Sequence, residues 1–377
     1  MKKVEKTDKS MMCFKKIKKA NIFLVGIGNI GTCLLNQIKE QQKNLFKKHN
    51  LQLRVTGIAD IDKFLITQEG IELKNWEKLF GKSGQKKDID FFINKMINLK
   101  LENSVFVDCT ASDEIAGKYE TILKKGVSIA TPNKKANSQS FDYYRRLKKL
   151  ASRNGVKFFY ETNVGAGLPV IGPLQNLILA GDEIYKIQGV FSGTLSYIFN
   201  NFSKQKKFSQ IVFEAYKNGY TEPDPRDDLN GMDVARKLLI LGREIGLKME
   251  LKDIRVESLL SNQCKRAKNL DEFFEQLKKS DAKFHQKITQ AQKNQKTLRY
   301  IGELKNGKAK VYLKEVGGDH PCFNLKDSDN IIAFCSKYYK TNPMVVKGPG
   351  AGREVTAAGV FADIIKVIKE PLKNKAI

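Results

Sequence analysis

The stretch Asn21-Ile-Phe-Leu-Val-Gly-Ile-Gly-Asn-Ile-Gly31 decides the fold of this chain. Its first half is almost wholly apolar, as a strand buried on both faces of a parallel sheet requires. The glycines have the spacing Gly-x-Gly-x-x-Gly, and the pattern that follows predicts a helix from about Ile30 to Lys48. A second apolar strand, Gln52–Ala59, ends at Asp60. The order is therefore strand, glycine loop, helix, strand and acid.

This order is the fingerprint of a dinucleotide-binding unit. The first glycine makes a tight turn, the second lets the backbone approach a pyrophosphate, and the third lets helix and strand pack closely. Free N–H groups at the helix start favour the anion. We therefore predict that NAD or NADP binds at the glycine loop, which consists of Gly26, Ile27, Gly28, Asn29, Ile30 and Gly31.

The choice between the two cofactors stays open at this point. Asp60 is placed to accept hydrogen bonds from the ribose hydroxyls, which favours NAD, and its alternative is an ordinary turn residue at a strand end. Lys63 lies close enough along the chain to neutralise a 2′-phosphate, which favours NADP.

The alternation of strands and helices continues beyond this unit. The sequence predicts strands at Ser104–Cys109 and Val127–Ala130, with a helix between them at about Asp113–Lys124. Such alternation implies a parallel sheet whose ligands bind outside the carboxyl ends of its strands. Thr110 and Lys134 follow those ends, so we expect both to face the cofactor.

Alternatives exist for the residues at these strand ends. Cys109 is a candidate nucleophile, but it lacks an evident histidine partner, so we interpret it as a small packed residue. In so lysine-rich a chain, Lys134 has an ordinary surface lysine as its alternative. Lys135 beside it would point elsewhere.

A different pattern begins at Val156 and indicates a second domain with a mixed sheet. Its predicted strands are Val156–Tyr160, Tyr185–Phe191, Leu298–Leu304, Ala309–Val316 and Ile331–Cys335, and its predicted helices include Leu168–Ala180 and the charged segment 271–294. Near the end of the chain, Gly350 and Gly352 open a last helix that runs to about Lys369. This second glycine-rich helix start predicts that the tail returns to the cofactor.

We therefore expect an α/β protein built on a Rossmann-type, doubly wound parallel sheet, with a second α+β domain on a mixed sheet. The dinucleotide-binding domain would comprise residues 20–155 plus 340–377. Residues 156–339 would bind substrate, carry out catalysis and mediate dimerisation, and residues 1–19 would form a flexible basic N-terminus.

A dense acidic segment lies in this basic chain, at Gly219–Lys237. Pro223 and Pro225 predict that 220–228 is not helical, and a helix is predicted from Leu229 to about Gly246. On that helix, Asp233 and Lys237 lie one turn apart on the same face. The arrangement suits binding an ammonium group beside an ionisable amine. The alternatives are a solvated ion pair for Asp233 and Lys237, and a helix N-cap for Asp227 or Asp228.

Composition narrows the classes of function. The formal net charge is +26, but the lysines are spread along all 377 residues, without an arginine-rich block or a zinc-finger spacing. We therefore expect no specific binding to nucleic acid. The six cysteines show no CxxC pair, the apolar patch at 11–14 is too short for a signal peptide, and no stretch is long enough to span a membrane. These features favour a cytoplasmic protein.

Taken together, these segments resemble the homoserine dehydrogenase family. The matching stretches run in the family's order, and the chain is most similar to the dehydrogenase half of bifunctional aspartokinase–homoserine dehydrogenases. They are VGIGNIG (25–31), TPNKKANS (131–138), YETNVGAGLPVI (160–171), FSGTLSYIF (191–199), the segment 219–246, and GPGAGREVTAAGVFADII (348–365).

The resemblance implies reversible NAD(P)H-dependent reduction of L-aspartate 4-semialdehyde to L-homoserine, in the biosynthesis of threonine, methionine and isoleucine. It implies that Lys237 is the general acid or base and that Lys134 and Asp233 assist it. The substrate would be bound by Glu222, Asp228 and Tyr220.

The resemblance also implies a structural monovalent cation, expected to be Na⁺, and a homodimer or homotetramer formed through the mixed sheet. The cation would be held by the loop residues Glu161, Val164, Ala166 and Leu168. Two other hypotheses remain at this stage. One is another NAD(P)-dependent dehydrogenase, such as an aldehyde-oxidising enzyme using Cys109, and the other is a decayed scaffold that serves as a basic binding protein.

Overall fold

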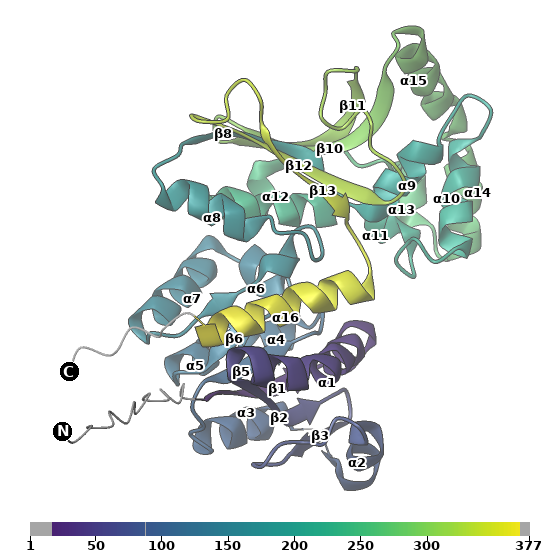
Figure 1. Ribbon diagram of the computed structural model, residues 1–377. Coiled ribbons are helices and arrows are strands. Elements are labelled where there is room, and N and C mark those ends of the chain that lie inside the picture. The colour runs from purple at the N-terminus through teal and green to yellow at the C-terminus, as the bar shows by residue number, and fades with distance from the viewer. Residues whose placement is uncertain (1–16, 87, 370–377) are drawn as a thin grey trace, which may run out of the picture.

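The computed structural model describes residues 17–86 and 88–369, which form two sheets with their helices (Figure 1). Residues 1–16 of the expected flexible N-terminus lie outside the described residues. Of the remaining three, Lys18 and Lys19 belong to the first strand, which therefore starts earlier than the sequence predicts.

The lower sheet in Figure 1 is the expected Rossmann-type sheet. Five of its strands are parallel, and β3 and β4 extend it in antiparallel fashion at one edge. In spatial order the strands are β4 (Gln85–Lys86), β3 (Lys63–Ile66), β2 (Leu51–Ala59), β1 (Lys18–Val25), β5 (Ser104–Asp108), β6 (Ser128–Ala130) and β7 (Phe158–Phe159).

Helices cover both faces of this sheet, which is why β1 is apolar throughout. Phe23 packs into the core on one side, and Ile22 and Leu24 pack into the core on the other. The helices α1 (Asn29–His49), α2 (Trp76–Ser83) and α16 (Arg353–Lys369) contribute to the second core. The first core includes residues of α3 (Ile89–Asn98), α4 (Asp113–Gly117), α5 (Tyr119–Lys124), α6 (Lys135–Ser138) and α7 (Phe141–Arg153).

The strand order places a crevice beside β1. From β1 the chain moves to β2 on one side, and it later returns to β5 on the other side. Ligands of such sheets bind outside the carboxyl ends of the strands at this switch point. The glycine loop after β1, Asp60 after β2, Thr110 after β5 and Lys134 after β6 all lie at that edge.

The upper sheet in Figure 1 has six strands, antiparallel except for the parallel pair β11–β9. In spatial order they are β13 (Met344–Pro349), β12 (Asp329–Ser336), β8 (Ile184–Val190), β10 (Thr297–Lys305), β11 (Lys308–Val316) and β9 (Ile254–Val256). Helices pack on one face. The other face carries a small separate apolar cluster that includes Val190, Ile301 and Ile331.

The remaining helices belong to this half of the chain. They are η1 (Glu161–Asn163), α8 (Ile171–Leu179), α9 (Gly193–Asn201), α10 (Phe208–Lys217), α11 (Pro225–Leu229), α12 (Met232–Glu244), η2 (Leu251–Asp253), α13 (Asn262–Arg266), α14 (Leu270–Lys278) and α15 (Asp281–Lys293). None of the helices in the described part of the chain is both long and apolar enough to cross a bilayer.

Several predicted elements need correction. The segment 220–228 is not free of helix, because α11 starts at Pro225. Proline is tolerated in the first helical position, where its missing N–H would have had no partner. The N-cap is Asp224, which accepts a hydrogen bond from Arg226 N at 2.9 Å, rather than Asp227 or Asp228.

Two predicted helices are each divided in the structure. The helix predicted at Asp113–Lys124 is interrupted at Lys118, between α4 and α5. The charged helix predicted over 271–294 consists of α14 and α15, separated at Lys279–Ser280. Apolar periodicity continues through both breaks, and the residue types that mark them, Gly117 and Ser280, were not used in the prediction.

The predicted domain limits also differ from the strand pairing. Residues 340–377 were expected with the dinucleotide-binding domain, but β13 pairs with β12 of the upper sheet, and α16 is the part that packs on α1. At the other limit, β7 pairs with β6 of the lower sheet although it follows residue 155. Short strands such as these are assigned by their partners, which a sequence does not name.

Candidate active site

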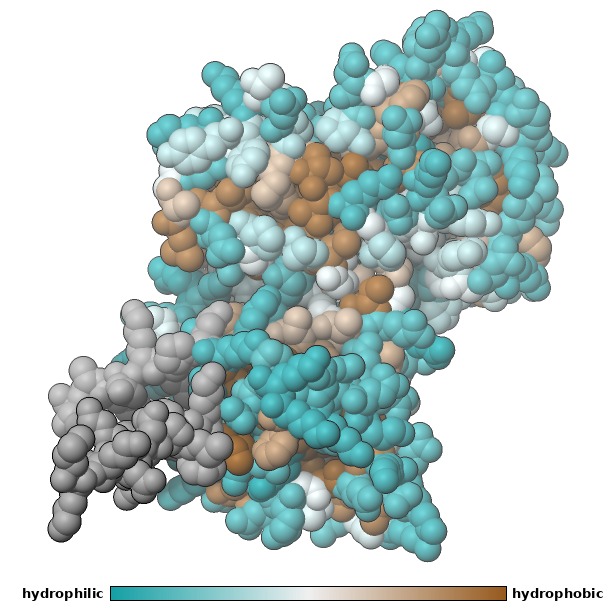
Figure 2. Space-filling view, viewed as in Figure 1, coloured by the Kyte–Doolittle hydropathy of each residue, from teal (hydrophilic) through white to brown (hydrophobic). Residues whose placement is uncertain are grey.

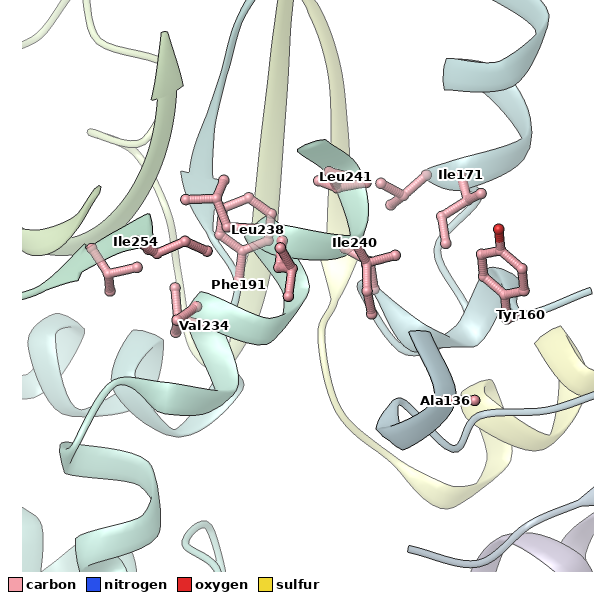
Figure 3. Packing of buried hydrophobic residues seen from close by; sticks show 14 of the residues in the cluster. Ala136, Tyr160, Ile171, Phe191, Val234, Leu238, Ile240, Leu241 and Ile254 are labelled. Atoms are coloured by element: carbon pink, nitrogen blue, oxygen red, sulfur yellow. The ribbon is translucent and has the colours of Figure 1, made fainter. Parts of the chain in front are cut away.

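A deeply buried helix carries the central lysine of the site. In its middle, from Leu238 to Leu241, α12 is continuously apolar and buried. Figure 3 shows Val234 and Leu238 facing Phe191, and Ile240 facing Ile171 and Tyr160. Lys237 projects from this helix and is 8% exposed. A buried ammonium group needs oxygen partners, so its surroundings determine what it can do.

Asp233 bridges two lysines from different parts of the chain. Lys237 Nζ lies 2.8 Å from Asp233 Oδ2, and Lys134 Nζ lies 3.1 Å from Asp233 Oδ1. Lys237 also donates a hydrogen bond to the main-chain oxygen of Phe191, at 2.7 Å. Lys135 points away, as the sequence predicts, and pairs with Asp113 at 2.8 Å. The solvated i,i+4 pair considered as an alternative is therefore wrong for Lys237.

The charges of this cluster shift the pKa values of its members. Burial lowers the pKa of Lys237 below the ordinary lysine value; Asp233 opposes this effect and Lys134 adds to it. Burial alone would raise the pKa of Asp233, but the ammonium groups of Lys134 and Lys237 outweigh it, and the net effect is a lower pKa. The cluster thus combines a fixed carboxylate with an amine that releases its proton more readily than an exposed lysine does.

The acidic segment forms a second group beside this cluster. Asp228 Oδ2 accepts a hydrogen bond from Glu222 N at 2.9 Å, which folds the segment back on itself. Burial raises the pKa of Asp228 to about 6, and the nearby charges of Glu222 and Asp233 add to this shift. Glu222 itself is exposed. The two carboxyl groups can therefore attract a cationic group towards Asp233 and Lys237.

Tyr220 is held in place by residues that the sequence analysis did not select. Thr194 Oγ1 donates a hydrogen bond to the main-chain oxygen of Tyr220 at 2.6 Å, and the Tyr197 ring stacks on the Tyr220 ring with centroids 4.3 Å apart. Both residues come from α9. The matching stretch FSGTLSYIF drew attention to this helix, but no local signal marked the two side chains.

The glycine loop has the geometry that dinucleotide binding requires. A Cβ atom at Gly31 would lie 2.0 Å from Gly26 O, so only glycine lets α1 approach the loop this closely. At Gly28, by contrast, an added Cβ atom would meet no atom within 4 Å. That open space belongs to a pocket of about 650 Å³, lined by Ile27, Gly28, Asn29, Thr32, Cys33, Asn36, Gln37, Glu40, Arg353 and Glu354.

The other predicted cofactor residues lie around this loop. Thr110 touches it directly, since a Cβ atom at Gly26 would lie 2.8 Å from Thr110 Cγ2. Asp60 N donates a hydrogen bond to Lys63 O at 2.8 Å, and the Lys63 side chain packs against Gly84 at the sheet edge. β2, which Asp60 follows, pairs with β1, whereas Lys63 begins β3, which lies one strand further from β1.

The tail reaches the pocket at the glycine loop with Arg353 and Glu354, directly after Gly350 and Gly352, which lie between β13 and α16. At Gly350 a Cβ atom would lie 1.9 Å from the Asn330 side chain, so glycine is required there. Further on, Gln37 Nε2 of α1 donates a hydrogen bond to Glu354 O at 3.0 Å. The C-terminal helix is thus fixed beside the start of α1.

A buried hydrogen-bond network, which the sequence analysis also missed, holds the loop that carries Lys134. Asp108 is fully buried and accepts hydrogen bonds from Tyr119 Oη at 2.6 Å, Asn133 Nδ2 at 2.9 Å and Thr110 N at 2.8 Å. Burial raises the pKa of Asp108, and these donors oppose the shift. The network ties the ends of β5 and β6 together and so fixes both Thr110 and the loop that carries Lys134.

Cys109 has no features of an activated thiol. Burial raises its pKa, and the neighbouring Asp108 raises it further, whereas a nucleophilic cysteine needs a lowered pKa. The interpretation of Cys109 as a packed residue at a strand end agrees with this environment.

The predicted cation loop fits a monovalent ion only through its backbone. The Glu161 carboxylate already accepts hydrogen bonds from Val170 N, Ile171 N and Gly172 N, at 2.6, 2.5 and 2.8 Å, at the start of α8. In the described residues, no backbone hydrogen bond to the carbonyl oxygens of Val164, Ala166 or Leu168 is observed. These oxygens are hard ligands of the kind that alkali and alkaline-earth ions prefer.

The fold defines a protein of the NAD(P)-dependent oxidoreductase class, with a Rossmann-type dinucleotide-binding domain and a second domain on a mixed sheet. Comparison with known proteins identifies the family. The family described as homoserine dehydrogenase matches residues 169–365, and its NAD-binding domain matches residues 26–161. The chain belongs to the homoserine dehydrogenase family, as its motifs suggested.

Individual relatives agree with this assignment. Homoserine dehydrogenase of Schizosaccharomyces pombe is 43% identical over 93% of this chain and 96% of its own length. The bifunctional aspartokinase/homoserine dehydrogenase of Haemophilus influenzae is 42% identical over 94% of this chain, which spans only 44% of that protein. Among solved structures, a hyperthermophilic archaeal homoserine dehydrogenase mutant in complex with NADPH has a TM-score of 0.73 and 25% identity, covering 94% of this chain and 99% of that one.

The two glycines of the loop predict different effects of the same substitution. Gly31→Ala should destabilise the protein by roughly 3 kcal/mol, because its Cβ atom would collide with Gly26 O. Gly28→Ala should cost about 1 kcal/mol or less, but should weaken NADPH binding at least tenfold because the methyl group enters the pocket. Urea unfolding and NADPH fluorescence titration of both variants measure these effects. Wild-type affinity in Gly28→Ala would contradict the placement of the pyrophosphate.

Proposed function

We propose that this protein catalyses the reversible reduction of L-aspartate 4-semialdehyde to L-homoserine with NAD(P)H, as a step in threonine, methionine and isoleucine biosynthesis. The observation that carries the proposal is the Lys134–Asp233–Lys237 cluster beside the acidic segment, at the cofactor edge of the lower sheet. The 96% coverage of the S. pombe homoserine dehydrogenase supports the same activity.

In this proposal Lys237 transfers the proton. The nicotinamide of the bound cofactor supplies or accepts the hydride, and the substrate oxygen must gain or lose one proton at the same time. An ammonium group has three N–H donors. In Lys237 one faces Asp233 and one faces Phe191 O, which leaves the third for the substrate oxygen. Lys237 thus protonates the oxygen during reduction and takes the proton back during oxidation.

The neighbouring residues position the reaction. Lys134 adds a second cation at the oxygen and stabilises negative charge that develops there. Asp233 keeps both ammonium groups in place, since it contacts each of them. Glu222 and Asp228, with Tyr220 at their side, bind the α-ammonium group of the substrate through charge complementarity.

The activity assay is direct. Purified protein is mixed with L-homoserine and either NAD or NADP, and nicotinamide absorbance is followed. Reduction of the cofactor is expected, and the ratio of the two rates decides between the contributions of Asp60 and Lys63. If neither cofactor is reduced by a protein that binds NADPH, the substrate assignment is wrong.

A structural sodium ion at the carbonyl oxygens of Glu161, Val164, Ala166 and Leu168 belongs to the same proposal. Its support is that the carbonyl oxygens of Val164, Ala166 and Leu168 accept no backbone hydrogen bond from the described residues, in a loop where Ala166 adopts a positive φ of 54°. Running the assay in tetramethylammonium salts instead of sodium salts should lower activity. Equal rates in both would remove the ion from the proposal.

Lys237→Ala should lower the turnover number by about 10³-fold, because the proton transfer loses its donor. NADPH affinity should stay within about twofold, since Lys237 lies outside the pocket at the glycine loop. Lys135→Ala removes the same charge at a lysine that faces Asp113, and should retain wild-type turnover. Steady-state rates with homoserine test both variants, and normal turnover in Lys237→Ala would exclude the mechanism.

Asp233→Asn should change the pH profile in a defined direction. Reduction needs protonated Lys237, so its rate falls as pH rises through the pKa of Lys237. Asp233 raises that pKa, and its neutral replacement should lower it, so the fall should start at a lower pH than in the wild type. The measurement is kcat for semialdehyde reduction over a pH range of about 6 to 10, which approaches the ordinary pKa of lysine from below. If the rate of Asp233→Asn falls at the same alkaline pH as that of the wild type, Asp233 does not influence the proton transfer.

We also propose a cytoplasmic homodimer or homotetramer. The five cysteines in the described residues are free thiols, which suits a reducing compartment. The face of the upper sheet opposite the helices includes Val345, which is 43% exposed, and Figure 2 shows apolar side chains over β12 and β13. Sedimentation equilibrium tests the assembly, and a monomer at micromolar concentration would contradict it.

A further inference from the structure

The pocket at the glycine loop has a wall that comes from the far end of the chain. Ile27, Gly28 and Asn29 line one side, and Arg353 and Glu354, the first two residues of α16, line the other. The two helices are held together by a shared apolar core that includes Leu34 and Ile38 of α1 and Val360 and Ile364 of α16. The position of Arg353 beside the loop is therefore fixed by packing.

Three arginines that lie near the two cores are engaged within the protein. Arg226 pairs with Asp224, Arg243 pairs with Glu250, and Arg299 donates to several main-chain oxygens. The Arg353 side chain is exposed and makes no hydrogen bond or ion pair with any residue that the structure describes. Its guanidinium group is thus available to a ligand.

The electrostatic neighbourhood agrees with this position. Burial raises the pKa of the Cys33 thiol on α1, Glu354 raises it further, and Arg353 acts in the opposite direction. Arg353 is therefore close enough to the first turns of α1 to affect a group there. Among the residues that line the pocket, Arg353 is the one with a cationic side chain, and Glu40 and Glu354 are acidic.

A dinucleotide brings two negative charges to this place. The diphosphate binds where the backbone of a Gly-x-Gly-x-x-Gly loop meets the helix N-terminus, which here is at Gly28 and Asn29. Without a cation, the acidic Glu40 and Glu354 would oppose those charges. An arginine is well suited to this position, because its planar fork donates two parallel hydrogen bonds to phosphate oxygens.

We propose that Arg353 binds the diphosphate of the dinucleotide, so that the C-terminal helix completes the cofactor site. The proposal rests on the NAD(P) binding of the proposed function. The diphosphate is common to NAD and NADP, so Arg353 should strengthen the binding of both. Asp60 and Lys63 differ from Arg353 in this respect, because Asp60 would favour the ribose hydroxyl of NAD and Lys63 the 2′-phosphate of NADP.

The test compares Arg353→Gln with Lys369→Gln in the 377-residue protein, by fluorescence titration with NADH and with NADPH. Both substitutions remove one positive charge from α16, but Lys369 lies at its other end, about 24 Å away at 1.5 Å per residue. Arg353→Gln should raise the Kd of both dinucleotides roughly tenfold, and Lys369→Gln should leave both within about twofold. Arg353→Lys keeps the charge without the fork and should give an intermediate Kd.

Three results with the variants would overturn the proposal. A loss confined to NADPH would assign Arg353 to the 2′-phosphate, an equal loss in Lys369→Gln would indicate only net charge, and unchanged Kd values would remove Arg353 from the site. Wild-type protein that binds neither dinucleotide would overturn both the proposal for Arg353 and the assignment of NAD(P) as the cofactor. Wild-type protein that binds both but does not oxidise homoserine would refute the proposed substrate alone, so the two failures are distinguishable.

Discussion

The buried ammonium group of Lys237 is the constraint on which the rest of the structure depends. An unpaired charge in an apolar core is too costly to persist, so oxygen atoms must be held beside it. Asp233 on the same helix provides one, and the main chain at Phe191 provides another. The Asp233 oxygen is a local feature of α12. The Phe191 oxygen requires that the chain leaving β8 pass close to the Lys237 ammonium group.

Phe191 connects this lysine with the cofactor side of the molecule. Its main-chain oxygen also accepts a hydrogen bond from Asn330 Nδ2 at 3.0 Å, and Asn330 is fully buried on β12. Gly350 packs directly on Asn330 before the chain turns into α16. A continuous series of contacts therefore leads from the amine to the helix that lines the dinucleotide pocket.

How much the sequence predicts depends on the range of each signal. The glycine loop, the strand that precedes it and the Asp233–Lys237 spacing are local, and the fold class and helix face follow from them. The predicted break at 220–228 was wrong because Pro223 and Pro225 were interpreted alike, although the second can begin a helix. β13 was not assigned to the upper sheet because a strand of six residues is defined by its partner β12.

The site shows the same division between local and distant contributions. Lys134, Asp233 and Lys237 were selected from the sequence, and the structure brings them together. Thr194, Tyr197, Asp108 and Phe191 O were not selected. Their contributions are contacts across the fold, such as a hydrogen bond to the Tyr220 backbone, and no spacing in the chain indicates them.

The oxygen of Phe191 has one more consequence, which concerns how the site tolerates sequence change. A main-chain oxygen is present whatever residue occupies position 191, so no single replacement there can delete the acceptor. Substitutions can act on it only by shifting the backbone just after β8. This part of the environment of the Lys237 amine depends on the path of the main chain and not on the identity of a side chain. It gives the site a mutational robustness that a purely side-chain site would lack.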